Sequence, residues 1–460
     1  MGSRVLGGHT TGRARYDRVG AMKGADVAKG KVISRRAVLR GGLGMAGAMA
    51  AGPWIVPASA LGQNGKPPSE RIVMGFIGVG GQGNQHIAGG PWTTTAGFLG
   101  RDDAQVVAVC DVEDERLSRT RQRVEDGYAG RFGKGSYKGC DGYKDFRDVL
   151  ARQDIDAVLI ASPDHWHALM SIMAIKAGKD VYCEKPISLT IREVREMVNV
   201  ARRYGKVLQA GTQQRSSGAF RYACELVRSG RIGKLLRAHV NVGGTSAYFD
   251  APEQAPPKGF DWNMWLGPAP WRPYSATIHR GWMAHRDYSG GEMTNWGAHH
   301  FDIAQWGIGG DETGPAEIFP PDGKEHKLLT YRYANGVEIV HGGHALSGVT
   351  FIGTGGMVNT DRWYCKSEPA SIARQPIGPN DVRLYDSKNH HDNFMECIRT
   401  RRRPAGDIGV IARSITVCHL GNIAYWLNRP LRWDAVKEEF MGDDEAKRWL
   451  DRPKRAPWRL

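Results

Sequence analysis

A glycine-rich stretch near the start of the chain offers the clearest chemistry. Residues 72–77 are apolar, and Gly78-Val79-Gly80-Gly81-Gln82-Gly83 follows them directly. In a strand–turn–helix unit, the first glycine permits a tight turn, the second lets a ligand approach the backbone, and the third lets helix and strand pack closely. The free N–H groups at the start of the helix favour phosphate. The spacing predicts a dinucleotide site, with a glycine turn that holds no phosphate as the alternative.

A carboxylate at the end of the next apolar run, residues 105–110, fits the same ligand. Asp111 lies 28 residues after Gly83. The usual spacing is about 20, and we assign the excess to an insertion at residues 93–103. A carboxylate in this position accepts hydrogen bonds from the adenosine ribose and repels a 2′-phosphate. We therefore expect NAD as the cofactor, with NADP as the less favoured option and a surface Asp without a ligand as the alternative.

Glu184-Lys185-Pro186 directly follows the later, mainly apolar run of residues 180–183. Ligands bind at the carboxyl ends of strands in open parallel sheets. The proline removes one N–H group and fixes the turn, so this placement allows Lys185 to point at a cofactor. A solvated Glu–Lys pair is the plainer interpretation of the spacing alone.

A third set of polar residues lies in the second half of the chain. If residues 295–302 are helical, Asn295, His299 and Asp302 share one face. Oxidising an alcohol needs a hydride acceptor near the C–H bond and a base near the O–H bond. A histidine titrates near neutrality, and a nearby cationic nicotinamide lowers the pKa of a lysine. Lys185 and His299 suit this chemistry, although a histidine that only packs or caps is the alternative.

The other histidines and the cysteines do not indicate a metal site. Pairs such as His165-x-His167 and His341-x-x-His344 have generic spacing, without an H-E-x-x-H motif or a thiolate. The seven cysteines form no C-x-x-C pair, so they predict neither a disulfide framework nor a zinc ribbon.

Alternating apolar runs and helix-period segments must position these residues. Strands are predicted at residues 72–77, 105–110, 157–161, 180–183 and 207–210, and helices at 114–125, 167–177 and 191–204. This alternation indicates a parallel sheet covered on both faces. After residue 216 we expect mainly antiparallel strands at 236–242, 327–333, 337–341 and 349–354, and helices at 391–401 and 408–428.

The positive charge is concentrated at the start of the chain. Residues 1–60 carry +8 of the formal net charge of +15, and no long basic run follows, so nucleic-acid binding is not indicated. Residues 34–40, Ser-Arg-Arg-Ala-Val-Leu-Arg, match the twin-arginine signal, and Ala58-Ser59-Ala60 fits a cleavage site. The apolar stretch 41–56 holds five glycines, a poor membrane span given the roughly 20 apolar residues needed. We expect export by the twin-arginine route to the periplasm or cell envelope, with a membrane anchor as the alternative.

The glycine loop, Glu184-Lys185-Pro186 and the Asn295-x-x-x-His299-x-x-Asp302 pattern together resemble the Gfo/Idh/MocA oxidoreductases, from about residue 72 to the C-terminus. Residues 261–270 and 290–297 also resemble the exported bacterial branch of that family. The resemblance implies an α/β Rossmann domain, placed at 61–214, followed at 215–460 by a substrate-binding α+β domain. That second domain has an open, mostly antiparallel sheet, which often forms the interface of a homo-oligomer, a dimer or a tetramer.

The resemblance also implies roles for single residues. Lys185 matches the lysine that contacts the nicotinamide and the reacting hydroxyl, His299 matches the general acid/base, and Asp302 matches a carboxylate one turn further on. Several sugar and inositol dehydrogenases of the family have Asp where this chain has Asn295, so the acid/base work falls more heavily on His299 and Lys185. The other contacts implied are Ser162, Pro163, Asp164 (usually Asn), His167, Glu184 and Gln213 for the cofactor, and Arg215 and Asp302 for the substrate.

Six of the 14 tryptophans lie between residues 262 and 306. Sugars present apolar C–H faces that stack on aromatic rings, so Trp282 and Trp296 are predicted substrate contacts, although core packing accounts for many of these rings. The expected activity is hydride transfer between a CH–OH group of a sugar, glycoside or polyol and a tightly bound NAD(P). A glycosidase that oxidises its sugar only transiently, or a non-catalytic sugar-binding protein, remains the alternative.

Overall fold

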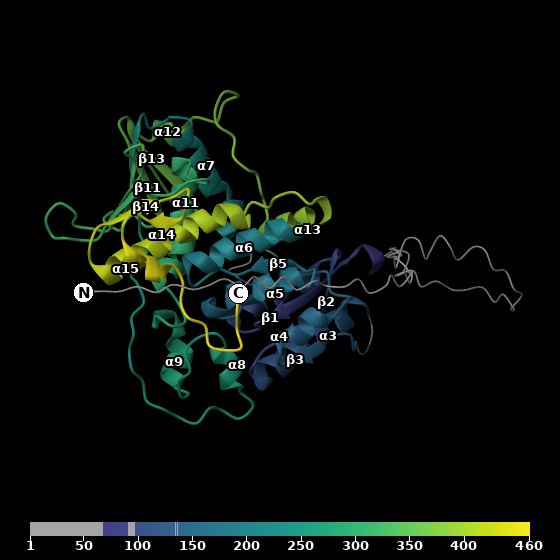
Figure 1. Cartoon of the computed structure of the whole chain (residues 1–460). Coiled ribbons are helices and arrows are strands. Elements are labelled where there is room, and N and C mark those ends of the chain that lie inside the picture. The colour runs from purple at the N-terminus through teal and green to yellow at the C-terminus, as the bar shows by residue number, and fades with distance from the viewer. Residues whose placement is uncertain (1–67, 91–96, 134, 136) are drawn as a thin grey trace, which may run out of the picture. The chain divides into compact units, whose positions relative to one another are not determined.

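The computed structural model describes residues 68–90, 97–133, 135 and 137–460 (Figure 1). The expected twin-arginine segment at 1–60 lies outside the described residues, and so do residues 93–96 of the expected insertion.

The first sheet contains six parallel strands in the order β3-β2-β1-β4-β5-β6. They are β1 (Ile72–Ile77), β2 (Ala104–Cys110), β3 (Asp141–Tyr143), β4 (Ala157–Ile160), β5 (Asp180–Cys183) and β6 (Leu208–Ala210). The strand order reverses between β1 and β4, which is where doubly wound sheets bind dinucleotides. The sheet therefore provides the expected frame for the glycine loop.

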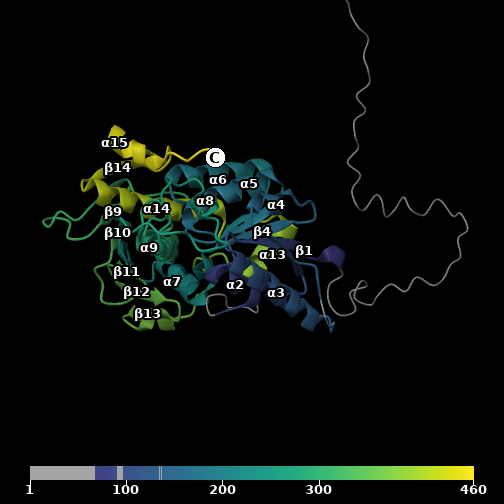
Figure 2. The same cartoon turned by 90° about the horizontal axis from the view of Figure 1, so that it is seen from below.

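Helices cover both faces of this sheet because alternate residues of each strand enter different apolar clusters. In β4, Val158 and Ile160 pack in one cluster, and Ala157 and Leu159 in the other. The first cluster includes α4 (Phe146–Ala151), α5 (Asp164–Lys176) and α6 (Ile191–Tyr204). The second includes α2 (Gly81–Ala88), α3 (Asp114–Arg131) and α13 (His390–Thr400), which returns from the far end of the chain (Figure 2).

The second sheet contains nine strands in the order β13-β12-β11-β7-β10-β9-β8-β14-β15, and only the pair β7–β10 is parallel among the pairings of the described residues. The strands are β7 (Leu235–Val240), β8 (Glu317–Phe319), β9 (Thr330–Arg332), β10 (Glu338–His341), β11 (Val349–Gly353), β12 (Gly356–Asp361), β13 (Tyr364–Glu368), β14 (Leu431–Asp434) and β15 (Glu439–Phe440). One face packs against α7 (Gly218–Arg228), α11 (Gly297–Ile308) and α14 (Ile408–Leu427). The shorter helices are α8 (Trp262–Leu266), α9 (Ala276–Gly281), α10 (Glu292–Asn295), α12 (Ser371–Arg374) and α15 (Asp444–Lys447).

The expected fold class is confirmed: a parallel Rossmann sheet precedes an open, mostly antiparallel sheet. The sequence did not indicate the strands β3, β8, β12, β13, β14 and β15 or the helices α4 and α7. β3 is a three-residue edge strand whose residues are all at least partly exposed, and no residue of β13 is fully buried. These two strands bury too little apolar surface to leave a sequence pattern.

The described part of the chain contains no helix that is both long and apolar enough to cross a membrane. Within the same residues, no group of three or more His, Cys, Asp or Glu side chains is arranged to hold a metal ion. All seven cysteines have free thiols, and six of them are buried.

Candidate active site

The glycine loop joins β1 to α2 with very little space around its backbone. Gly78 has a φ of 81°, and a Cβ atom there would lie 2.6 Å from the backbone nitrogen of Ser162. A Cβ on Gly83 would lie 2.1 Å from the carbonyl oxygen of Gly78. A side chain at Gly78 would collide with the backbone that follows β4, and one at Gly83 would push α2 away from β1, so the roles expected for the first and third glycines agree with the geometry.

Asp111 ties the end of β2 to this loop. Its side chain is 7% exposed, and its carboxylate accepts hydrogen bonds from the backbone N–H groups of Val79 at 2.9 Å and Glu113 at 3.1 Å. Burial raises the pKa of Asp111, and these two N–H groups oppose that rise. The carboxylate thus faces the region where the adenosine ribose of a dinucleotide is expected.

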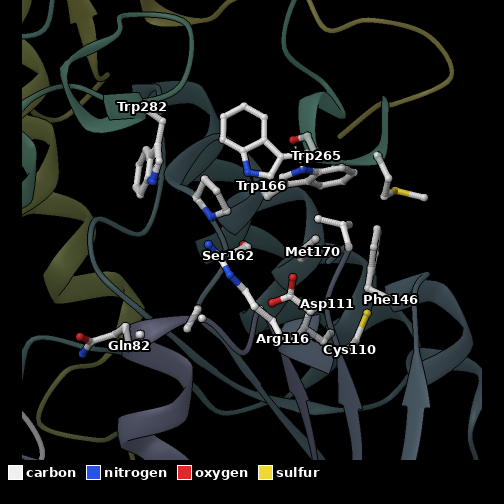
Figure 3. A pocket seen from close by; sticks show the side chains of 18 of the residues that line it. Gln82, Cys110, Asp111, Arg116, Phe146, Ser162, Trp166, Met170, Trp265 and Trp282 are labelled. Carbon is white, nitrogen blue, oxygen red and sulfur yellow. Dashed lines mark hydrogen bonds between the residues drawn. The ribbon is translucent and has the colours of Figure 1, made fainter. Parts of the chain in front are cut away.

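A cavity of about 430 Å³ opens between the glycine loop and the second domain (Figure 3). Asp111 and Arg116 lie on one side of it, and Trp265 and Trp282 of the second domain lie on the other. Of the expected cofactor contacts, Gly78, Gly80, Gly81, Gln82, Asp111, Ser162 and Pro163 line the cavity. Trp282, which we expected to contact substrate, also lines this cavity, from the second domain.

The loop after β4 divides its residues between this cavity and the protein interior. The hydroxyl of Ser162 is buried and has no hydrogen-bond partner among the described residues. Asp164 instead accepts a hydrogen bond from the Ser289 hydroxyl at 2.7 Å, and burial raises its pKa to about 7. His167 Nδ1 lies 2.6 Å from the carbonyl oxygen of Pro186. Asp164 and His167 therefore fasten this loop to the second domain and to the turn that follows β5.

Glu184, which directly follows β5, is buried, and both of its carboxylate oxygens have hydrogen-bond partners. One of its oxygens lies 2.8 Å from His86 Nε2 on α2 and accepts a hydrogen bond from the Gln213 amide at 2.9 Å. Burial alone would raise the pKa of Glu184, but the contact with His86 and the charge of Lys185 lower it to about 2. Gln213, which we expected to contact the cofactor, thus supports the carboxylate beside the lysine.

Lys185 points across to the second domain. Its ammonium donates a hydrogen bond to the side-chain oxygen of Asn295, at the end of α10. The amide nitrogen of Asn295 donates to the two carboxylate oxygens of Glu292 at 3.2 and 3.1 Å. The three side chains form one continuous hydrogen-bonded row, and they bring two of the expected catalytic residues together.

His299, in the first turn of α11, is 5% exposed. Burial, followed by the positive charges of Lys185 and Arg362, lowers its pKa well below the usual value. The imidazole is therefore neutral near pH 7, and its Nδ1 atom has no hydrogen-bond partner among the described residues. A neutral imidazole with an uncommitted nitrogen is equipped to bond a hydroxyl group or to accept its proton.

Arg215 and Asp302, which we expected to contact substrate, are buried and bonded to each other. Their side chains are 4% and 0% exposed, and two hydrogen bonds of 2.8 Å join guanidinium and carboxylate. The carboxylate also accepts from Ser414, and the guanidinium donates to Asp311. A buried charge needs a partner, and each of these residues is the other's partner.

Trp296 is 37% exposed and stacks on His300, with the ring planes 9° apart. The centroid of the Trp296 ring lies 6.0 Å from that of the His299 ring. The guanidinium of Arg362 lies 4.6 Å from the same Trp296 centroid. The expected substrate contact Trp296 therefore lies next to the expected base.

Several residues of this site were not indicated by the sequence. Arg116 and Trp265 line the cavity, Glu292 ends the row that begins at Lys185, and Arg362 faces His299. Only Glu292 had a local signal, because it is three residues before Asn295 and so lies on the same side of a helical turn.

Two family models match the chain. One, described as oxidoreductase family, NAD-binding Rossmann fold, matches residues 72–212. The other, described as oxidoreductase family, C-terminal alpha/beta domain, matches residues 243–460. The first matched segment covers all six strands of the first sheet, and the second covers every strand of the second sheet except β7.

Curated relatives match over a shorter segment. A glycosyl hydrolase family 109 protein of Shewanella pealeana is 30% identical over 170 residues, which cover 37% of this chain and 35% of the relative. A second protein of that description, from Shewanella baltica, is 30% identical over 170 residues, which cover 37% of this chain and 34% of that relative. The chain thus matches about a third of the length of these relatives.

Solved structures share the fold at lower identity. The WlbA dehydrogenase of Bordetella pertussis, in complex with NADH and UDP-GlcNAcA, is 18% identical with a TM-score of 0.53, covering 79% of this chain and 99% of that one. The aldose-aldose oxidoreductase of Caulobacter crescentus is 17% identical with a TM-score of 0.53 and the same coverage. With both domains matched by their family models and the same fold in these enzymes, the chain belongs to the Gfo/Idh/MocA oxidoreductase family.

Proposed function

We propose that this protein is an NAD(P)-dependent oxidoreductase that moves a hydride between a CH–OH group of a sugar, glycoside or polyol and a tightly held nicotinamide cofactor. The observation that carries the proposal is the meeting of Lys185, Asn295 and a neutral, buried His299 at the junction between the Rossmann domain and the second domain. An amine, an amide and an imidazole at one place can hold a hydroxyl group and take its proton.

The residues present fit a nicotinamide dinucleotide. The glycine backbone and the start of α2 would hold the pyrophosphate, and Asp111 would hold the adenosine ribose. The unpartnered hydroxyl of Ser162 supplies a further polar group at the cavity wall. When bound, the nicotinamide supplies the acceptor for the hydride. The carboxylate of Asp111 favours NAD over NADP.

The protein side chains then divide the remaining work. The Lys185 ammonium donates a hydrogen bond to the substrate oxygen, and Asn295 orients that ammonium. His299 accepts the hydroxyl proton as the C–H bond breaks and the C=O bond forms, and it returns the proton in the reverse direction. Low exposure of His299 limits competing proton exchange with water.

A second candidate is a glycosidase that oxidises its sugar transiently, eliminates the aglycone, adds water and reduces the sugar again. The relatives described as glycosyl hydrolase family 109 proteins favour it. It needs the same proton-transferring residues but produces no net reduced cofactor.

We also propose a carbohydrate as the substrate class, because Trp296 offers a partly exposed ring next to His299. The twin-arginine motif at residues 34–40 supports export to the periplasm or cell envelope. A homo-oligomer, formed through the open sheet of the second domain, completes the proposal.

The test is to incubate purified protein with NAD and a panel of sugars, polyols and aryl glycosides, following near-ultraviolet absorbance and aglycone release together. Stoichiometric reduced cofactor would establish a dehydrogenase, and aglycone without net reduced cofactor would establish the glycosidase. A protein that carries no dinucleotide and does not bind added NAD would refute both enzyme functions. His299→Asn should lower either activity by about 10²-fold or more while it still binds cofactor.

A further inference from the structure

The position four residues before His299 holds a neutral amide in this chain, and a carboxylate lies directly behind it. Lys185 donates to the oxygen of Asn295, and the nitrogen of Asn295 donates to both oxygens of Glu292. The amide thus has a positive group on one side and a negative group on the other.

The chemistry of the two ends fixes the orientation of this amide. An ammonium only donates hydrogen bonds and an ionised carboxylate only accepts them, so the amide oxygen must face Lys185 and the amide nitrogen must face Glu292. Each bond polarises the amide in the direction that strengthens the other. The negative charge of Glu292 therefore acts on the Lys185 ammonium through Asn295.

The backbone around Glu292 is shaped to hold its side chain in this place. Gly291, directly before it, has a φ of 76°, and a Cβ atom there would lie 2.5 Å from the backbone nitrogen of Ser246. A Cβ atom on Gly243 would lie 2.6 Å from the Cβ of Glu292. Gly243 thus leaves room for the first carbons of the Glu292 side chain, and Gly291 lets the backbone before Glu292 pass close to residues 244–246.

Two other carboxyl groups, Glu184 and Asp164, also interact with the charge of Lys185, but each has hydrogen-bond partners of its own. Glu184 faces His86 and Gln213, although one of its oxygens also accepts the backbone N–H of Lys185 at 3.1 Å. Asp164 is bonded to Ser289 and, at a pKa of about 7, is only partly ionised at neutral pH. The imidazole of His299 is neutral, and it lies within reach of the positive charges of both Lys185 and Arg362. Glu292 is the carboxylate whose charge reaches the ammonium through a side-chain relay.

We propose that Glu292 is a positioning residue of the active site, which holds the Lys185 ammonium toward the substrate oxygen through Asn295 and supplies the negative charge that the amide lacks. The inference rests on the proposed function for its catalytic meaning, but the electrostatic coupling between Glu292 and Lys185 is measurable without any substrate.

The test compares wild type with Glu292→Gln, with the double variant Glu292→Gln/Asn295→Asp, and with Glu312→Gln, which removes an exposed carboxylate elsewhere in the second domain. Trace acylation with acetic anhydride across a pH series, read by mass spectrometry of the peptide that holds Lys185, gives the reactivity of this amine at each pH. In Glu292→Gln, Lys185 should be acylated roughly tenfold faster than in wild type at the acidic end of the series, because the ammonium loses a stabilising negative charge. The double variant should restore the wild-type rate, because its carboxylate lies directly on the ammonium, and Glu312→Gln should leave the rate unchanged.

An unchanged acylation profile in Glu292→Gln, or a double variant that fails to restore it, would overturn the inference whether or not a substrate is known. If Glu292→Gln does not fold, as judged by thermal unfolding and NAD binding, Glu292→Asp and the double variant decide the question in the same assay. On an active substrate, Glu292→Gln should reduce kcat by about tenfold with little change in the KM for NAD, and the double variant should recover it. A restored profile without any activity would instead count against the proposed function and leave the coupling standing.

Discussion

Replacing Asp111 by Asn tests the cofactor site without knowledge of the substrate. The change removes one negative charge and keeps the shape of the side chain. In the structure both carboxylate oxygens are used, one by the N–H of Val79 at 2.9 Å and the other by the N–H of Glu113 at 3.1 Å. Asn keeps one of these acceptors and places an NH₂ group where the other was, so it meets a backbone donor with a donor.

The size of the effect follows from the lost interactions. A hydrogen bond to a charged group contributes about 1.5–3 kcal/mol, and about 1.4 kcal/mol corresponds to tenfold in affinity. We therefore expect NAD to bind Asp111→Asn about 10- to 100-fold more weakly. NADP should lose less or gain, because the carboxylate no longer repels its 2′-phosphate and Arg116 lines the same cavity. The preference for NAD over NADP should fall at least tenfold.

The assay is titration of protein fluorescence with NADH and with NADPH at one fixed ionic strength, since Trp265 and Trp282 line the cavity. Asp126→Asn, which removes an exposed carboxylate from α3, is the matched control and should change neither affinity. A ratio of the two affinities that is the same in Asp111→Asn and wild type would refute the assignment of Asp111 to the ribose.

Three further outcomes are expected. Gly83→Ala should weaken NAD binding at least tenfold, because its Cβ would lie 2.1 Å from a carbonyl oxygen, whereas Gly130→Ala, with open space around it, should stabilise α3 by about 0.5–1 kcal/mol in urea unfolding. Asp302→Ala should lower the free energy of unfolding by about 3 kcal/mol because it leaves Arg215 buried with Asp311 alone, while the NAD affinity of the folded protein stays the same; a change confined to substrate KM would contradict this. Burial raises the pKa of Asp164 in the folded protein to about 7. The protonated carboxyl therefore contributes stability that is present below pH 4 and is lost as the pH rises through 7. Asp164→Asn should have a free energy of unfolding up to about 4 kcal/mol above that of wild type between pH 5 and pH 8.

Local patterns were enough to predict the elements that surround the cofactor. β1 and β5 begin and end where their apolar runs do, and the glycine loop follows β1 directly. These strands are buried on both faces, so apart from Asp180 at the start of β5 their residues are apolar or nearly so, and the run itself marks the element. The motif glycines are equally local, because each is required by atoms within the same strand–turn–helix unit or its neighbour.

What the sequence could not indicate depends on contacts between distant segments. The buried pair Arg215–Asp302 joins residues 87 positions apart, and the contact of Lys185 with Asn295 joins residues 110 positions apart. The family pattern marks Asp302 as a carboxylate near the site, but only packing decides whether its oxygens face substrate or a buried guanidinium. Trp265 likewise reaches the cofactor cavity because the second domain folds over the first.

Buried side-chain contacts join helix α2, which follows the glycine loop, to the turn that carries Lys185. The positions of these two segments therefore depend on each other. With Glu184 ionised, its oxygen accepts a hydrogen from His86 Nε2, and His86 Nδ1 lies 2.8 Å from His391 Nε2 on α13. His86 belongs to α2, the helix whose first turn would bind the pyrophosphate, while Glu184 precedes Lys185. A shift of α2 therefore moves the support of the lysine, and α13, which arrives from the far end of the chain, restrains both. Through His391, α13 thus helps to fix the spacing between the start of α2 and the turn that carries Lys185.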